Sequence, residues 1–194
     1  KDGLADYENA EVQLTRNTDL TRSLSERTTY ANRWGADLFC SIHINAATSS
    51  SADGFESFTY PGSKTATKAF QNGIHRSILA KVTFDDRGQK QANFHVLRET
   101  QMTSILTENG FISNVADAKK LKDPSFLQKL AEGHVIGIAE HLGLKKKQKA
   151  ISKPTTERTL YRVQVGAFAD HDNAEAFLKK VQAEGFKDSY ITTD

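Results

Sequence analysis

The feature that most constrains the fold of this chain is the segment 36–46, which reads ADLFCSIHINA. Apolar and polar side chains alternate along it, and the side chains of a β-strand point alternately to the two faces of a sheet. The apolar face of this predicted buried strand carries Leu38, Cys40, Ile42 and Ile44. The opposite face carries Ser41, His43 and Asn45, so an imidazole is expected near the carboxyl end of the strand.

A second predicted strand, 104–107, leads directly into Glu108. Ligands of open α/β sheets bind beyond the carboxyl ends of the strands, so His43 and Glu108 are candidates for one site. A histidine that binds a metal and a glutamate that accepts a proton are components of a hydrolytic zinc site. Taken alone, however, a strand histidine is more often a hydrogen-bonded structural residue, and a glutamate at a strand end is more often solvated.

The remainder of the chain alternates between predicted strands and helices. Strands are expected at 11–16, 55–60 and 94–97, and later at 161–168 and 189–192. Helices are expected at 20–34, at 66–79, from Asp123-Pro124 to Leu142, and from Asp170 or Asp172 to Gly185, with the end of another helix at 1–8. Residues 85–88 are expected to begin a polar loop. This alternation predicts an α/β fold with a twisted, mixed sheet flanked by helices.

Composition excludes several classes of function. The net charge of +2 over 194 residues is nearly balanced and gives no strong case for nucleic-acid binding. No apolar run approaches the roughly 18 residues that a membrane helix needs, and no apolar core follows Lys1 as in a signal peptide. Cys40 is the single cysteine, so no intramolecular disulfide can form, and its place on the apolar face favours a buried hydrophobic role.

The blocks SIHIN at 41–45 and LTENGFISN at 106–114 resemble two signature blocks of the zinc-dependent N-acetylmuramoyl-L-alanine amidases. Further stretches fit this family in the same order: 11–16, Arg27 with Ala31-Asn32, 86–88 and 94–98. These enzymes cleave bacterial peptidoglycan between the lactyl group of muramic acid and the first L-alanine. The resemblance implies a twisted sheet flanked by helices, zinc at the strand ends, and a place in the extracellular bacterial cell wall.

The same resemblance implies roles for individual residues. His43 matches a zinc ligand, and Glu108 matches the general base. Two more ligands, a histidine and a glutamate, are expected upstream of Lys1, so this stretch of chain could be inactive by itself. Asn45, Arg87 and Arg98 are candidate substrate contacts, although Asn45 could equally be a loop hydrogen-bonder and the arginines could form surface ion pairs.

The periodic pattern is lost at 145–159, where four of the first five residues are lysine, and we expect a linker there. Residues 160–194 resemble the first half of a sporulation-related (SPOR) repeat, which implies binding to peptidoglycan glycan strands. Arg162, Gln164 and Phe168 are the expected wall contacts. The predicted organisation is therefore a catalytic domain at 1–144, a linker at 145–159 and a partial α+β SPOR-like domain at 160–194.

Two other readings remain open from the sequence. A non-catalytic peptidoglycan-binding protein or inactive fragment would bind the wall without cutting stem peptides, although it would have no need to keep His43 and Glu108. A different zinc hydrolase on a related sheet, such as a carboxypeptidase, would release free C-terminal amino acids. The block 108–114 favours the amidase over this last reading.

Overall fold

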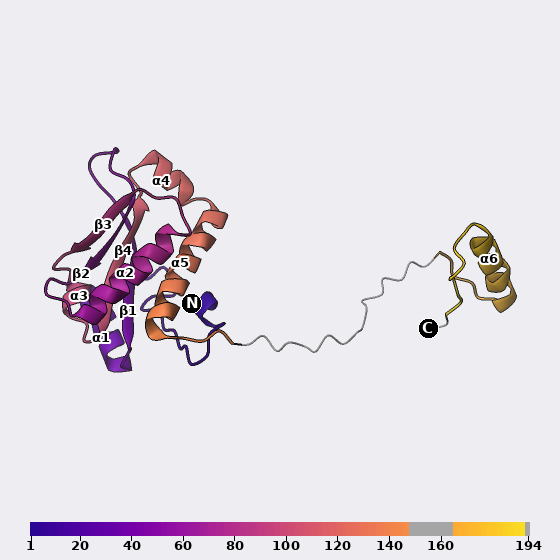
Figure 1. The fold of residues 1–194 in the computed structure, drawn as a ribbon, viewed down its shortest axis with the longest axis horizontal. Helices are drawn as coiled ribbons and strands as arrows, with labels where there is room; N and C mark the ends of the chain where they lie inside the picture. The colour runs from indigo at the N-terminus through magenta and orange to yellow at the C-terminus, as the bar shows by residue number, and fades with distance from the viewer. Residues whose placement is uncertain (148–164, 193–194) are drawn as a thin grey trace. The chain divides into compact units, whose positions relative to one another are not determined.

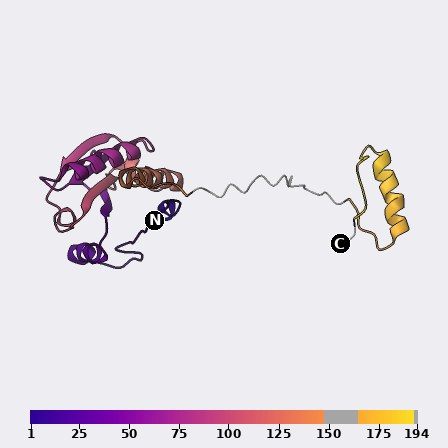
Figure 2. The same cartoon turned by 60° about the horizontal axis from the view of Figure 1, so that its bottom comes forward.

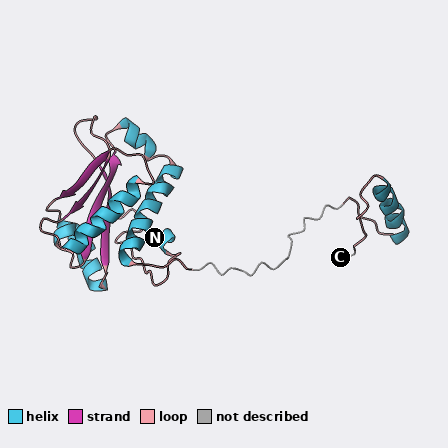
Figure 3. Cartoon of the chain, viewed as in Figure 1, coloured by secondary structure: helices cyan, strands magenta, loops and turns pink. Residues whose placement is uncertain are grey.

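The computed structural model describes residues 1–147 and 165–192, and the chain divides into two compact units, Lys1–Gln148 and Lys149–Asp194. The first unit contains a sheet with helices on both faces (Figures 1 and 3). Its strands are β1 (Leu38–Asn45), β2 (Phe55–Thr59), β3 (Asp86–Gln91) and β4 (Thr103–Phe111), in the order β1-β4-β2-β3. β1 is parallel to β4 and β2 to β3, whereas β2 and β4 are antiparallel, which confirms the predicted mixed sheet.

Helices α2 (Thr65–Leu79) and α5 (Pro124–Leu142) pack together on one face of the sheet. The core beneath them is formed mainly by Phe55, Phe70, Ile74, Ile78, Ile105 and Leu130. The two helices meet closely at Gly137, where an added Cβ would lie 2.5 Å from the Cα of Ile74. A residue without a side chain is therefore required for this packing.

The opposite face is covered over part of its length by α1 (Leu24–Trp34) and α3 (His95–Arg98). A second core there contains Ala31, Phe39, Val96, Leu97 and Leu106. Figure 2 shows α1 on the other side of the sheet from the α2–α5 pair. Beyond this second core, towards the carboxyl ends of β1 and β4, the same face carries polar side chains.

Local sequence signals account for the helix ends. Ser23 and Glu26 form a reciprocal capping box at the start of α1, and Gly35 ends the helix with a φ of 71°. Asp123 caps α5 by accepting a hydrogen bond from the Ser125 amide, Pro124 occupies the first turn, and Gly143 ends the helix. The predicted boundaries of α5 are confirmed.

Four predictions for the first unit are wrong. Residues 94–97 were expected to form a strand, but His95–Arg98 form helix α3. Val96 and Leu97 are adjacent and both buried, which a helical turn allows, whereas adjacent residues of a strand point to opposite faces. Residues 86–91 form strand β3 rather than a loop; as an edge strand it keeps polar side chains. Residues 11–16 form no strand, since no described strand pairs with them, and 1–8 contain only the short helix η1 (Asp2–Leu4).

The apolar face of β1 is also only half covered. Leu38 and Cys40 pack against the core under α2 and α5, as expected. Ile42 and Ile44 lie on the same face but are 60% and 49% exposed. The buried character predicted for the whole strand therefore holds only for its first half.

The second unit is described from 165 to 192 and contains helix α6 (His171–Ala183), capped by Asp170. The helix is as predicted, but 165–168 and 189–192 carry no strand, and 161–164 lie outside the described residues. Two short strands by themselves are at best marginally stable, and three or more strands or packing against a helix are needed for a stable sheet. Of the expected linker, residues 145–147 pair with the chain near Tyr7, and the remainder lies outside the described residues.

Candidate active site

Three ionisable side chains lie in a row across the neighbouring strands β1, β4 and β2. His43 on β1 is the register partner of Glu108 on β4, and Glu108 is also the partner of Glu56 on β2. Directly opposite residues of neighbouring strands share a face, so the three side chains are neighbours on the face that carries α1 and α3. We call His43, Glu108 and Glu56 the polar row. The structure thus brings the two predicted residues together and adds a third.

Glu56 was missed by sequence reasoning. Its neighbours in β2, Phe55 and Ser57, are fully buried, and Glu56 itself is only 4% exposed. A carboxylate in the middle of a short buried strand is unusual, because a buried charge is costly unless it is paired. That interruption of the apolar pattern at 55–60 is the signal that could have identified it.

A bulge in β4 shapes the end of the row. The register shifts between His43 and Asn45, so that Asn45 pairs with Phe111, and Gly110 adopts a φ of 80°. An added Cβ at Gly110 would lie 2.8 Å from the ring of Phe84. Beside the bulge, the buried Asn109 donates a hydrogen bond of 2.8 Å to the carbonyl of His43, which fixes β1 against β4 at the row.

Glu56 is paired with donors from both sides. Asn45 Nδ2 donates to its Oε1 at 2.8 Å, Arg87 Nε donates to its Oε2 at 3.1 Å, and Lys90 Nζ donates to the same oxygen. Burial raises the pKa of Glu56, but the hydrogen bonds and positive charges of Lys90 and Arg87 outweigh this effect and lower the pKa overall. Glu56 is therefore a permanently charged carboxylate near neutral pH.

Glu108 has the opposite environment. Its Oε2 atom is buried and accepts no hydrogen bond from any described residue. Burial, together with the negative charge of Glu56, raises the pKa of Glu108 to about 7. Two carboxyl groups whose pKa values are driven apart are typical of acid–base sites, and Glu108 is the one that can exchange a proton near neutral pH.

His43 is half-buried, and its Nε2 is hydrogen-bonded to Ser41 Oγ at 2.8 Å. Burial lowers the pKa of His43, and the positive charge of Arg27 adds to the effect. The neutral imidazole that results is the form that binds a metal. The donor types of the row suit zinc, but residues 1–147 and 165–192 contain no group of three His, Cys, Asp or Glu side chains that could hold an ion.

The two candidate arginines have different surroundings. Arg87 lies beside the polar row: besides Glu56 it contacts the carbonyl of Asp53 at 3.1 Å, and its guanidinium carbon lies 4.8 Å from the ring centre of Phe111. Arg98 on α3 is instead bonded to Glu99 and Asn93, each at 2.6 Å. None of these contacts of Arg98 involves the polar row.

A second histidine cluster lies under α2. Ser57 Oγ is 2.9 Å from His75 Nδ1, and His75 Nε2 is 2.8 Å from Asp86 Oδ1. Although these residue types occur in nucleophilic triads, Ser57 is fully buried and no substrate can reach it. The cluster ties α2 to β2 and β3, so His75 has a packing role.

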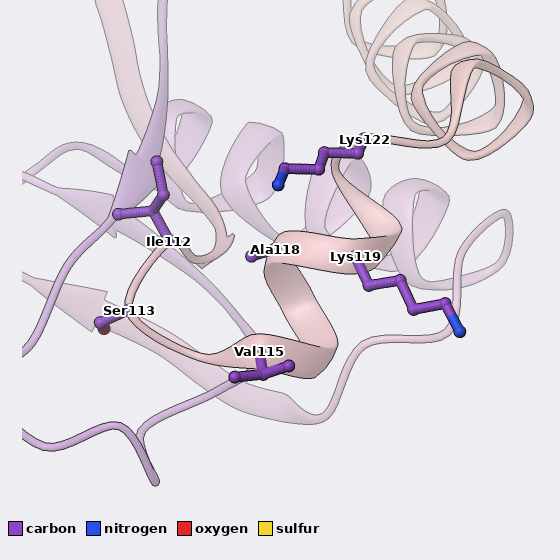
Figure 4. Close-up of a pocket in the computed structure, with 6 residues that line it drawn as sticks. All are labelled: Ile112, Ser113, Val115, Ala118, Lys119 and Lys122. Carbon is purple, nitrogen blue, oxygen red and sulfur yellow. The ribbon is translucent and has the colours of Figure 1, made fainter.

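A surface hollow lies away from the row. It has a volume of about 380 Å³ and is lined by Ile112, Ser113, Val115, Ala118, Lys119 and Lys122 (Figure 4). These residues follow β4, and three of the six belong to helix α4 (Val115–Lys120). No residue of the polar row lines it.

In the second unit, Phe168 is 46% exposed and its ring centre lies 5.2 Å from that of Phe177. The other two expected wall contacts, Arg162 and Gln164, lie outside the described residues. Among the helices that the structure describes, none has the length and apolar character to cross a membrane.

The mixed sheet and its row of one imidazole and two carboxylates define a catalytic domain of the α/β class with acid–base groups on one sheet face. Residues 1–140 match the model of the N-acetylmuramoyl-L-alanine amidase family, and residues 139–193 match that of the SPOR domain. The chain belongs to the N-acetylmuramoyl-L-alanine amidases, hydrolases of peptidoglycan, and carries a SPOR region, as the sequence blocks predict.

Relatives and solved structures agree with this assignment. The chain is 44% identical over 189 residues to the sporulation-specific N-acetylmuramoyl-L-alanine amidase of Bacillus subtilis (strain 168), covering 97% of this chain and 70% of that protein. It is also 44% identical to the amidase CwlM of Bacillus licheniformis, over 98% and 71% of the two chains. The catalytic domain of CwlV from Bacillus (Paenibacillus) polymyxa var. colistinus superposes with a TM-score of 0.70 at 36% identity, covering 74% of this chain and 79% of that one.

Proposed function

We propose that this chain hydrolyses the amide bond between N-acetylmuramic acid and the L-alanine of the stem peptide, with Glu108 as general base. The observation that carries the proposal is the position of Glu108 beside His43 on neighbouring strands, with a pKa raised to about 7. A base of that pKa is efficient near neutral pH. Amidase activity on peptidoglycan is in keeping with the names of the relatives described above.

Glu108 would transfer one proton twice. It accepts a proton from the attacking water as the water oxygen bonds to the amide carbonyl carbon. It then gives that proton to the alanine nitrogen as the carbon–nitrogen bond breaks, which leaves the lactyl carboxylic acid and a free amino terminus. The buried, unbonded Oε2 of Glu108 is available for this exchange, since no described residue competes for it.

His43 is the proposed zinc ligand. When bound, zinc would polarise the scissile carbonyl and lower the pKa of a water molecule towards about 7. The neutral imidazole of His43, oriented by Ser41, supports this role. Since three protein ligands are usual for a catalytic zinc, two ligands besides His43 are required.

Substrate contacts are proposed for Asn45, Arg87 and Arg98. Arg87 is held against Glu56 and Phe111 at the row, where a guanidinium can meet a carboxylate of the stem peptide. Asn45 contacts Glu56 and the amide of Ala46, so it would orient the site. Arg98 would have to give up its hydrogen bonds to Glu99 and Asn93 in order to bind substrate. It is therefore the least supported of the three proposed substrate contacts.

We further propose a catalytic domain at 1–144, a linker at 145–159 and a wall-binding domain at 160–194, with Arg162, Gln164 and Phe168 as wall contacts. The SPOR match supports the wall-binding domain, and the exposure of Phe168 supports its role as a wall contact. Peptidoglycan, through its stem peptides and glycan strands, is the partner, and the protein would act outside the cell at the bacterial wall.

The test is turnover of purified peptidoglycan by the full-length, zinc-loaded protein and by Glu108→Ala. We expect the substitution to reduce the rate of stem-peptide release by at least about 100-fold, the lower end of the contribution of a general base. Glu132→Gln, at a partly exposed ion pair on α5, is the control and should retain the full rate. Full turnover by Glu108→Ala would refute the proposed base, and release of free C-terminal amino acids instead would indicate a carboxypeptidase.

A further inference from the structure

Hydrogen bonds from the described residues do not fix the buried Oε2 atom of Glu108. A general base must nevertheless be held within a few tenths of an ångström of its productive geometry. The groups on either side of Glu108 are therefore the ones that can hold it, and on the β2 side that group is Glu56.

Glu56 is the centre of a bridge that passes over β4. Asn45 belongs to β1 and Glu56 to β2, and β4 lies between these strands in the sheet. The hydrogen bond from Asn45 to Glu56, 2.8 Å long, therefore crosses β4 beside Glu108. On its other side Glu56 is bonded to Arg87 and Lys90 of β3, so a single carboxylate connects elements on both sides of the base.

Stability alone does not account for this arrangement. The side chain of Glu56 is 6% exposed, and placing a carboxylate there costs free energy that its partners only compensate. Apolar side chains of similar size in buried positions are often as stabilising as a buried ion pair. Glu56 is the register partner of Glu108, so its charge lies next to the proposed base.

We propose that Glu56 is a positioning residue for the amidase reaction: by bridging Asn45 to Arg87 and Lys90 across β4, it holds the carboxyl group of Glu108 in its reactive orientation. The inference rests on the proposed role of Glu108 as general base. Glu56 itself takes no proton and touches no substrate, because its oxygens are already occupied by Asn45, Arg87 and Lys90.

Glu56→Gln in the full-length, zinc-loaded protein is the first test. Glutamine keeps the size of the side chain and an oxygen acceptor for Asn45, but it loses the charge that holds Arg87 and Lys90. We expect kcat to fall about 10- to 100-fold, because a misplaced base slows the chemical step. KM should change by a smaller factor, since the only proposed substrate contact that loses a partner is Arg87. Glu132→Gln, at a partly exposed carboxylate paired with Lys81, should change neither value.

Asn45→Ala is the second test, chosen because it leaves both ion pairs of Glu56 in place and so retains the fold. It removes one end of the bridge, and we expect a smaller loss in kcat of about 3- to 10-fold. An unchanged kcat for both Asn45→Ala and Glu56→Gln, or a rise in KM alone, would overturn the inference.

A double-mutant cycle separates positioning from general structural damage. If Glu56 acts through Glu108, then adding Glu56→Gln to Glu108→Gln should lower the residual rate by less than about twofold. A full, additive loss in that background would overturn the inference and leave the proposed base intact. Full turnover by Glu108→Gln alone would refute the proposed base, and the inference with it.

Discussion

Replacing the proposed base should stabilise the protein, and only above a defined pH. The pKa of Glu108 in the folded protein is about 7, against a usual value of 4.5. As pH rises through this window, the unfolded chain gives up a proton that the folded chain retains. Rising pH therefore favours unfolding between about 4.5 and 7, and the penalty persists at higher pH.

The size of the effect follows from the same two values. The interval of about 2.5 pH units corresponds to about 3.4 kcal/mol at 1.36 kcal/mol per unit. Glu108 is only half-buried, so solvent screening reduces this limit, and we expect about 1–2 kcal/mol. Glu108→Gln, which cannot ionise, should match the parent protein near pH 4 and exceed its stability by that amount at pH 8.

The assay is urea unfolding in the presence of a chelator, followed by the fluorescence of Trp34, the single tryptophan, which lies in α1 of the first unit. Glu11→Gln, at an exposed position, provides a control for the loss of one carboxylate. A stability difference between Glu108→Gln and the parent that does not vary from pH 4 to pH 8 would refute the reasoning.

Further predictions concern the packing that supports the row. Gly137→Ala should lower the free energy of unfolding by about 1–3 kcal/mol in urea titrations, because its Cβ would lie 2.5 Å from Ile74 Cα. Gly73→Ala, on α2 with nothing within 4 Å of the added Cβ, should instead be neutral or stabilising by up to about 1 kcal/mol, and equal losses for both would contradict the packing argument. Asp123→Ala should cost about 1 kcal/mol by removing the cap of α5, whereas an unchanged unfolding midpoint would show that the cap is dispensable.

The sequence predicted those features that depend on local periodicity and capping. The alternation at 38–45 placed His43 and Asn45 on one face, and the Asp123-Pro124 and Gly143 signals set the ends of α5. It also indicated that His43 and Glu108 lie at comparable positions of their strands. The register confirms that the two residues are partners, although β4 continues to Phe111 beyond the predicted strand end. Family resemblance supplied what these short patterns could not, namely the class of reaction.

Features that depend on non-local pairing were not predictable in this way. The order β1-β4-β2-β3 places Glu56 beside Glu108, although the two residues are far apart in sequence. Strand β3 was hidden because an edge strand needs no apolar alternation, and the four residues of α3 are too few to distinguish helical from strand periodicity. The charged environment that separates the pKa values of the two carboxyl groups arises only from that pairing.

The most direct test of the central claim is to identify the bond that is cut. Peptidoglycan fragments released by the full-length, zinc-loaded protein and by its Glu108→Ala variant can be compared by mass spectrometry with end-group labelling. We expect the parent protein to produce stem peptides with free L-alanine amino termini and muramic acid with an intact lactyl carboxylate, and Glu108→Ala to produce neither above background. New amino termini that appear equally with Glu108→Ala, or products cut at any other bond, would contradict the account.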